Sequence, residues 1–189
     1  KNLDLIKYLV EEIKLDPQTL NAQKSLPLHI AIQQKDTAIS RYLTNKSPTY
    51  LQKLDKEQRS LLHLAAREGN LEGVKTFLKA GLSITQIDKR GYQPIHYAVE
   101  SGNLELIKYI TQQKIDLNVV AINLDSYYSN LYTPLHVAIQ NSHKEVVRWL
   151  IKQGVDIHAV DRHGNTALHL AAVNGKKELV QLLIDQKAH

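Results

Sequence analysis

Apolar residues recur along the chain in short segments that come in pairs and have helical spacing. Leu106, Ile107 and Ile110 follow one another at intervals that place them on one face of a helix. The preceding segment of each pair carries small residues, such as Ala138 in one copy, which leave that helix slim enough for close packing. Gly102 lies between two such segments and indicates the turn that joins them. The pattern predicts pairs of short helices.

Polar turns and helix-start signals separate these pairs. Asp88-Lys89-Arg90-Gly91 and Asp161-Arg162-His163-Gly164 are typical of tight turns at the tips of projecting hairpins. After a tip, Thr133 is suited to cap a helix, and Pro134 fits its first turn, where a missing N–H costs nothing. The chain therefore predicts helix pairs linked by hairpins.

One phrase repeats five times in register. Successive histidines of this phrase are 34, 33, 40 and 33 residues apart. A glycine follows six residues after three of the histidines, at Gly69, Gly102 and Gly175. No unit of this size buries its apolar face alone, so we expect the units to stack, each touching its neighbours. The five copies are Leu26-Pro27-Leu28-His29-Ile30-Ala31, Ser60-Leu61-Leu62-His63-Leu64-Ala65, Gln93-Pro94-Ile95-His96-Tyr97-Ala98, Thr133-Pro134-Leu135-His136-Val137-Ala138 and Thr166-Ala167-Leu168-His169-Leu170-Ala171.

The phrase and its period resemble the ankyrin repeat family, over essentially the whole chain. Lys35 and Ser142 depart from the family pattern, because glycine is usual there, and Gly73 lies inside a predicted helix at a cost of about 1 kcal/mol. The resemblance implies an all-α ankyrin-repeat solenoid of stacked helix-turn-helix units with hairpin loops. It also implies that each phrase histidine is buried, hydrogen-bonds backbone and locks the following turn.

The register divides the chain into one domain of successive units. Residues 1–20 correspond to the second half of a repeat, and the first helix of that repeat is missing. The last unit keeps the apolar pattern of an interior repeat, so we expect a segment of a longer protein. The repeats that follow the half repeat are 21–54, 55–87, 88–127, 128–160 and 161–189.

Composition narrows the function classes. The absence of cysteine excludes disulfides, cysteine-ligated zinc, iron–sulfur clusters and thiol catalysis. The net charge of +5 comes from 24 basic and 19 acidic residues that are interleaved rather than clustered. No apolar run approaches the roughly 20 residues of a membrane span, so we expect no membrane contact. An intracellular, cytoplasmic location suits the lack of cysteine, and the Lys, Ile, Gln and Asn content is compatible with a bacterial or viral effector acting in host cytoplasm.

Neither a metal site nor an active site is predicted. Equivalent positions on stacked helices lie about 8–10 Å apart, whereas zinc ligands lie about 2 Å from the ion, so the five phrase histidines cannot share one metal. His158 and His163 near one hairpin leave a two-ligand site as an alternative to two solvated histidines. No phosphate-binding glycine motif occurs, and the recurring glutamates indicate a solvated helix face. We therefore expect no cofactor and no enzymatic activity.

The 40-residue spacing implies about seven extra residues near 121–127 at a hairpin tip. They are a tolerated loop insertion or a recognition finger. The second interpretation rests on the local tyrosines, since tyrosine is enriched among interface hot spots. The alternatives remain open here.

The ankyrin resemblance implies that hairpin tips and inner helices form a concave wall that contacts another protein. Mixed charges on that wall suggest a mixed-charge protein partner, bound by a monomer. Alternatives are the substrate-targeting part of a larger enzyme, and nucleic-acid or nucleotide binding through the basic residues, against which Glu57, Glu68 and Glu100 argue. The candidate contact residues are Lys56, Glu57, Arg59, Arg67, Glu68, Lys89, Arg90, Tyr92, Tyr97, Glu100, Ser101, Tyr127, Tyr128, Ser129, Tyr132, Gln140, Asn141, Arg162, His163 and Asn165.

Overall fold

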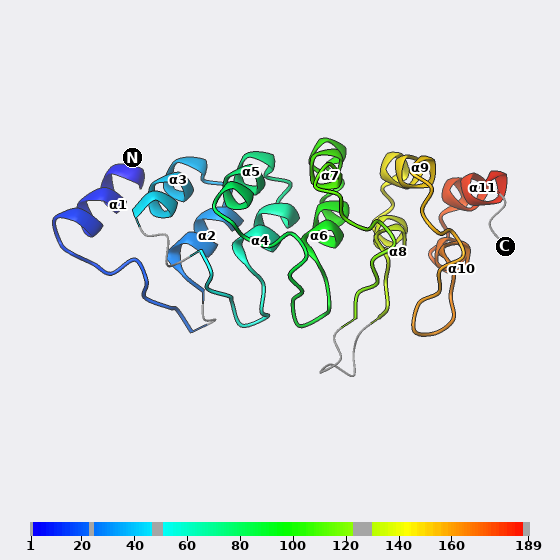
Figure 1. The fold of residues 1–189 in the computed structure, drawn as a ribbon, viewed down its shortest axis with the longest axis horizontal. Coiled ribbons are helices and arrows are strands. Elements are labelled where there is room, and N and C mark those ends of the chain that lie inside the picture. The colour runs from blue at the N-terminus through cyan, green and yellow to red at the C-terminus, as the bar shows by residue number, and fades with distance from the viewer. Residues whose placement is uncertain (1, 23–24, 47–50, 123–129, 187–189) are drawn as a thin grey trace.

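Two rows of short helices with hairpins beneath them make up the chain (Figure 1). The structure is a computed structural model that describes residues 2–22, 25–46, 51–122 and 130–186. Within these residues there are eleven helices and one isolated β-bridge, between Val160 and Thr166. The helices are α1 (Asn2–Glu11), α2 (Pro27–Gln33), α3 (Thr37–Lys46), α4 (Leu61–Arg67), α5 (Leu71–Lys79), α6 (Pro94–Ser101), α7 (Leu104–Thr111), α8 (Pro134–Gln140), α9 (Lys144–Lys152), α10 (Ala167–Val173) and α11 (Lys177–Asp185).

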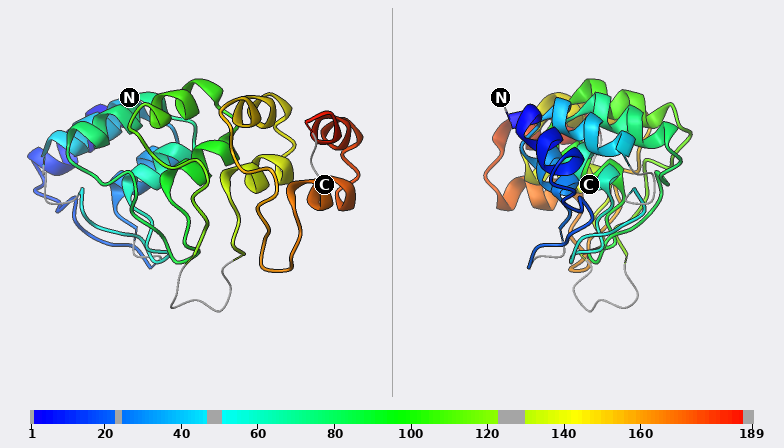
Figure 2. Two further views of the ribbon diagram at one scale, coloured as in Figure 1. Left: turned by 45° about the vertical axis from the view of Figure 1, so that its right-hand side comes forward. Right: turned by 90° about the vertical axis from the view of Figure 1, so that its left-hand side faces the viewer.

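The helices alternate between an outer and an inner row. Odd-numbered helices from α1 to α11 form the upper row in Figure 1, and even-numbered helices form the row below, from which the hairpins project. Each inner helix packs against the inner helices beside it and against the outer helix that follows it. The end-on view in Figure 2 shows the two rows as layers with the hairpins on one side. An all-α solenoid is therefore confirmed.

Apolar side chains between the rows form one continuous core. Leu62, Ile95 and Leu135 of successive inner helices are almost fully buried, as are Phe77 and Ile107 of the outer helices. These positions are the apolar ones of the helical pattern in the sequence. Because each unit supplies only part of the core, the units are stable in the stack and not singly.

The phrase histidines lie in the first turn of the inner helices, and two of them bond to the neighbouring unit. Nδ1 of each accepts a hydrogen bond from the backbone N–H three residues earlier, at 2.8–3.2 Å. With Nδ1 accepting, the proton of the neutral ring lies on Nε2. Nε2 of His63 donates to the Tyr92 carbonyl at 3.0 Å, and Nε2 of His96 donates to the Tyr132 carbonyl at 3.1 Å. These two histidines therefore lock the hairpin of the next unit, as expected.

The other phrase histidines differ in detail. Nε2 of His29 and of His136 is buried without a hydrogen-bond partner among the described residues, although carbonyls of Lys53 and Asn165 lie nearby. His169 is exposed, because no further hairpin among the described residues covers it. The expectation that every phrase histidine is buried is therefore wrong for His169.

The two residues that stand where the family usually has glycine keep the left-handed backbone conformation that glycine favours. Lys35 and Ser142 have φ of 56° and 62°, close to the 66° and 72° of Gly69 and Gly102. A residue with a Cβ in this left-handed region is strained by about 1 kcal/mol. The turn between the two helices of a unit therefore dictates the backbone even where the sequence lacks glycine.

Substitution of Ser142 by glycine should release this strain. We expect Ser142→Gly to raise the free energy of unfolding by about 0.5–1 kcal/mol, measured by urea denaturation. Ser142→Ala is the matched control, because it also removes the hydroxyl but keeps the Cβ, and it should leave the midpoint nearly unchanged. Equal stabilisation by both variants would show that the hydroxyl, not the backbone, is responsible.

Candidate protein-binding surface

Each regular hairpin tip is built around a buried aspartate. Asp88 Oδ1 accepts hydrogen bonds from the backbone N–H groups of Arg90 at 2.8 Å and Tyr92 at 2.9 Å. Asp55 and Asp161 make the same two bonds in their own tips. All three side chains are nearly inaccessible. The aspartates therefore fold the tips, and their side chains are not available for direct contact with a partner.

Hydrogen bonds favour the ionised form of two of these carboxylates, Asp55 and Asp161. Burial alone would raise the pKa of Asp55, but the hydrogen bonds from the side chain and backbone of Arg59 outweigh it and hold that pKa below its usual value. Arg59 binds Asp55 through Nε at 2.8 Å and Nη2 at 2.7 Å. In Asp161 the bonds from the Asn165 backbone and side chain likewise overcome burial and lower the pKa. Arg59 and Asn165 consequently brace their tips and lie half-buried on the wall.

Tyr92 and Tyr97 do not lie on the surface, and their assignment as contact residues is wrong. They are only 2% and 3% exposed. The ring of Tyr92 stacks on His96 with centroids 4.9 Å apart, and the guanidinium of Arg90 covers its other side at 4.2 Å. The hydroxyl of Tyr97 donates to Asp88 Oδ2 at 2.6 Å. Both tyrosines thus pack beneath the tip, and Arg90 is the exposed residue.

Tyr132 is half-exposed and connects a hairpin to an inner helix. Its ring stacks on His136 with centroids 5.8 Å apart, and its hydroxyl accepts a hydrogen bond from Gln140 Nε2 at 2.8 Å. Gln140 is exposed at the end of α8. The pair presents an aromatic face beside an amide, a combination suited to contact with a protein surface.

The remaining helix-end candidates lie at the C-terminal ends of α4, α6 and α8. Glu68 is near Lys35 at 3.9 Å and Arg67 at 3.5 Å, so its charge is partly compensated. Ser101 Oγ donates to the Ala98 carbonyl, and Asn141 Nδ2 donates to the Val137 carbonyl. The backbone carbonyl of Glu100 accepts a hydrogen bond from His143 Nε2 in the next unit. These residues form a polar border farther from the tips.

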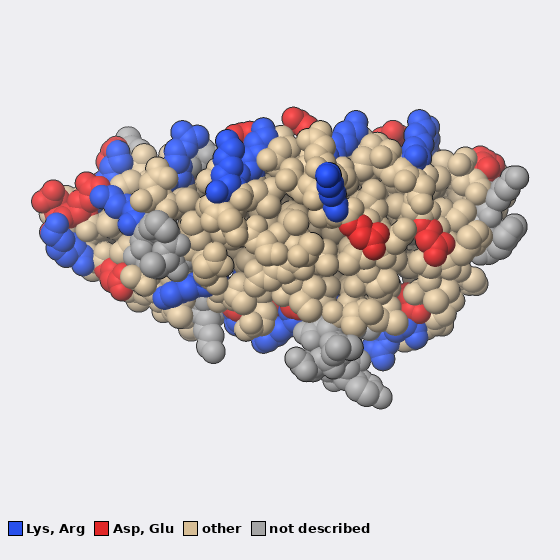
Figure 3. Space-filling model, in the orientation of Figure 1, with Lys and Arg blue, Asp and Glu red and all other residues tan. Residues whose placement is uncertain are grey.

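Backbone hydrogen bonds tie neighbouring tips together. The N–H of Lys89 donates to the Glu57 carbonyl at 3.0 Å, and the N–H of Arg162 donates to the Asn130 carbonyl at 3.1 Å. Lys56, Lys89, Arg90, Arg162 and His163 are exposed, whereas Glu57 is half-buried. These bonds place Lys89 beside the tip that carries Lys56 and link Arg162 to the preceding hairpin. Separate groups of Lys and Arg side chains lie along the lower edge in Figure 3.

Three candidates, Tyr127, Tyr128 and Ser129, lie outside the described residues, as does most of the insertion near 121–127. On either side of the residues that the structure does not describe, the Ala121 N–H donates to the Tyr132 carbonyl at 2.9 Å. The recognition finger stays a prediction.

The sequence interpretation missed exposed aliphatic residues in the hairpins. Leu20, Ile87 and Val160 are each about half exposed and directly precede the first residue of a tip. The signal was present, because an apolar residue before the Asp or Asn recurs in step with the repeat.

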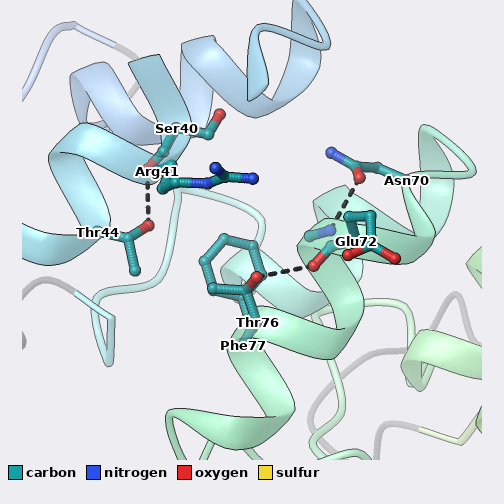
Figure 4. A pocket seen from close by; sticks show the side chains of 8 residues that line it. Ser40, Arg41, Thr44, Asn70, Glu72, Thr76 and Phe77 are labelled. Atoms are coloured by element: carbon teal, nitrogen blue, oxygen red, sulfur yellow. Dashed lines mark hydrogen bonds between the residues drawn. The ribbon is translucent and has the colours of Figure 1, made fainter. Parts of the chain in front are cut away.

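A small notch on the opposite, outer-helix side offers little chemistry. It lies between α3 and α5, with a volume of about 50 Å³, enough for a few waters. Thr44 and Thr76 donate their hydroxyl protons to backbone carbonyls of Ser40 and Glu72, and Asn70 caps α5 (Figure 4). Most polar groups lining the notch are therefore engaged by their own helices.

Neither a metal cluster nor a membrane helix emerges from the described ranges. No group of three or more His, Asp or Glu side chains within them is placed to hold a metal ion. In the same ranges, no helix has the length and apolar character needed to cross a membrane.

Comparison with known proteins agrees with the architecture. No curated protein sequence matches the chain. A family model described as ankyrin repeats, in three copies, matches residues 1–88, 52–121 and 121–189, which together span the chain. Ankyrin repeats generally act as protein–protein interaction modules and are typically non-catalytic. The helix pairs, the histidine locks and this match agree, and the chain belongs to the ankyrin repeat family.

Proposed function

We propose that this chain binds a partner protein through its hairpin wall, meaning the exposed tip residues together with Tyr132 and Gln140. The observation that carries the proposal is that the tips are folded before a partner binds and are held to neighbouring hairpins by backbone hydrogen bonds. Buried aspartates fold each regular tip, and backbone bonds at Lys89 and Arg162 tie neighbouring tips together. A surface held in place before binding loses little conformational entropy on association.

The side chains on this wall are of kinds that interfaces favour. Arg90 is exposed on top of a buried tyrosine, and Tyr132 presents half of its ring. Arginine and tyrosine are enriched among the residues that contribute most to binding energy. Both are held by stacking contacts, so little side-chain freedom is lost when a partner binds.

The double variant Arg90→Ala/Tyr132→Ala tests the proposal. We expect it to weaken partner binding about tenfold or more while retaining the helical circular dichroism spectrum. Tyr92 is left intact, because its removal would open the core. Immobilised wild-type and variant chains would be used to capture proteins from cell lysates, and the dissociation constant of a retained protein would then be measured with each purified chain.

The control variant is Lys108→Ala/Arg148→Ala, which removes two exposed cations from α7 and α9 on the opposite side. It should bind within about twofold of the wild type, because distant surface changes have small effects. A partner lost by the wall variant and kept by the control supports the proposal. Equal retention by both, or no protein retained above a blank surface, would contradict it.

A further inference from the structure

A row of aliphatic side chains runs along the hairpins. Its members occupy equivalent positions in successive hairpins. Each directly precedes the residue whose backbone N–H donates to the carbonyl on the other side of its hairpin. The closing pairs are Asn21 to Ser25, Asp55 to Arg59, Asp88 to Tyr92, Ala121 to Tyr132 and Asp161 to Asn165. The aliphatic row is accordingly Leu20, Leu54, Ile87, Val120 and Val160.

The row is accessible to a partner. Leu20, Ile87 and Val160 are 46%, 44% and 52% exposed, and Leu54 and Val120 are half-buried. Alternation along an extended strand explains this, since Asp88 points inward and its neighbour Ile87 outward. Single exposed aliphatic residues are ordinary, but here one recurs at the same place in successive hairpins, and together they form a strip of spaced apolar positions.

Positive charge borders the strip. The residues that follow the row at the tips include Lys56, Lys89, Arg90 and Arg162, all exposed. The aspartates between them and the row are buried, and their oxygens are engaged by turn N–H groups. Among the described tip residues, Glu57 is the acidic side chain that remains at the surface, half-buried. Most of the charged side chains that a partner can contact directly at the tips are therefore cations, and the aspartates lie beneath them.

Repeat spacing sets the shape of a matching ligand. Packed helices lie about 8–10 Å apart, so consecutive row members recur at roughly that interval. A polyproline II segment turns once every three residues and rises about 9 Å in doing so. Its every third side chain therefore recurs at about the interval between successive hairpins.

We propose that the aliphatic row and its basic border bind an extended acidic segment of a protein that carries an aliphatic residue at every third position. This inference rests on the proposed function, because it names the chemistry that the hairpin wall recognises. Aliphatic contacts favour a protein segment over nucleic acid, whose phosphates would use only the cations.

The test uses a fluorescent peptide of about five Leu-Glu-Pro triplets, long enough to span the hairpins. Binding to the whole chain is measured by fluorescence anisotropy. A peptide of the same composition with the leucines clustered should bind about tenfold more weakly, as should peptides with Ser for Leu or Lys for Glu. A single-stranded oligonucleotide of equal charge serves as a competitor.

The row variant is Ile87→Thr/Val160→Thr, which keeps the branched Cβ and removes apolar surface. It should lose affinity for the triplet peptide about tenfold. The matched control, Leu5→Thr/Ile184→Thr, removes exposed aliphatic side chains from the outer helices α1 and α11 and should bind within about twofold of wild type.

Three results would overturn the inference: no measurable binding of the triplet peptide, equal binding to the row variant, or stronger binding of the oligonucleotide. Failure here is separable from failure of the proposed function. A partner captured from lysate that is lost by Arg90→Ala/Tyr132→Ala but kept by the row variant would preserve the hairpin wall as a binding surface and reject the aliphatic row.

Discussion

Acidification from about pH 7 to about pH 5 should lower the free energy of unfolding by about 2 kcal/mol through His96 alone. Burial lowers the pKa of His96 to about 4, more than the hydrogen bond to the Tyr132 carbonyl raises it. In the unfolded chain the same imidazole has a pKa near its ordinary value of 6.5. Urea denaturation at both pH values measures the difference.

The direction follows from proton binding. Between about pH 6.5 and pH 4 the unfolded state binds a proton at His96 and the folded state does not, so stability is fully present above pH 6.5 and falls as the pH decreases toward 4. Burial also lowers the pKa of His29, His63 and His136, and their losses add in the same direction. Asp55 and Asp161, whose pKa values are lowered, contribute only at more acidic pH.

His163→Gln provides the control, because this histidine is exposed at a tip. The variant should show the same pH dependence as the wild type. In NMR spectra the buried imidazoles should remain neutral until the chain unfolds. A wild-type free energy of unfolding that is constant from pH 7 to pH 5 would contradict the histidine locks.

Gly91→Ala should destabilise the chain by about 2–4 kcal/mol, combining backbone strain with steric conflict. Gly91 has φ of 76°, and a Cβ placed on it would lie 2.3–2.5 Å from the backbone of Ile122. Because both partners are backbone, rotation of a side chain cannot relieve the overlap. The hairpin leading into the insertion would have to move away from its neighbour. Thermal denaturation measures the loss.

Gly164→Ala is the matched control for this effect. Gly164 occupies the same place in the last tip, with φ of 79°, but a Cβ there meets nothing within 4 Å. It should cost only the left-handed strain, about 1 kcal/mol. Equal losses in the two variants would mean that the contact with Ile122 does not contribute.

Much of the fold follows from the sequence because it depends on local rules that repeat. The helix starts at the phrase histidines, the tight turns at Asp88 and Asp161, and the stacking of apolar faces are each dictated by residues within one unit. Repetition in register then places the units. The backbone hydrogen bonds of His63 and His96 were expected from the resemblance to the ankyrin repeat family.

The binding surface was harder to predict because it depends on contacts between side chains. Tyr92 occupies the same tip position as Arg59 and Asn165, which are half-exposed, yet its ring is buried by His96 and Arg90. Sequence shows that aspartates and cations share the tips, but not that the aspartate side chains are buried while Lys56, Lys89 and Arg90 are exposed. Burial, not composition, decides which of these charged side chains a partner can contact.

In the tips, the atoms that hold the fold together differ from the side chains that are exposed to a partner. His63 and His96 hold the next hairpin by its carbonyl oxygens, and Asp88 holds its own turn by N–H groups, atoms that almost every amino acid supplies. Exposed residues between those anchors, such as Lys56 and His163, are therefore exchangeable with little penalty to the scaffold. Specificity in this chain can diversify by substitution at the tips while the framework that presents them is inherited intact.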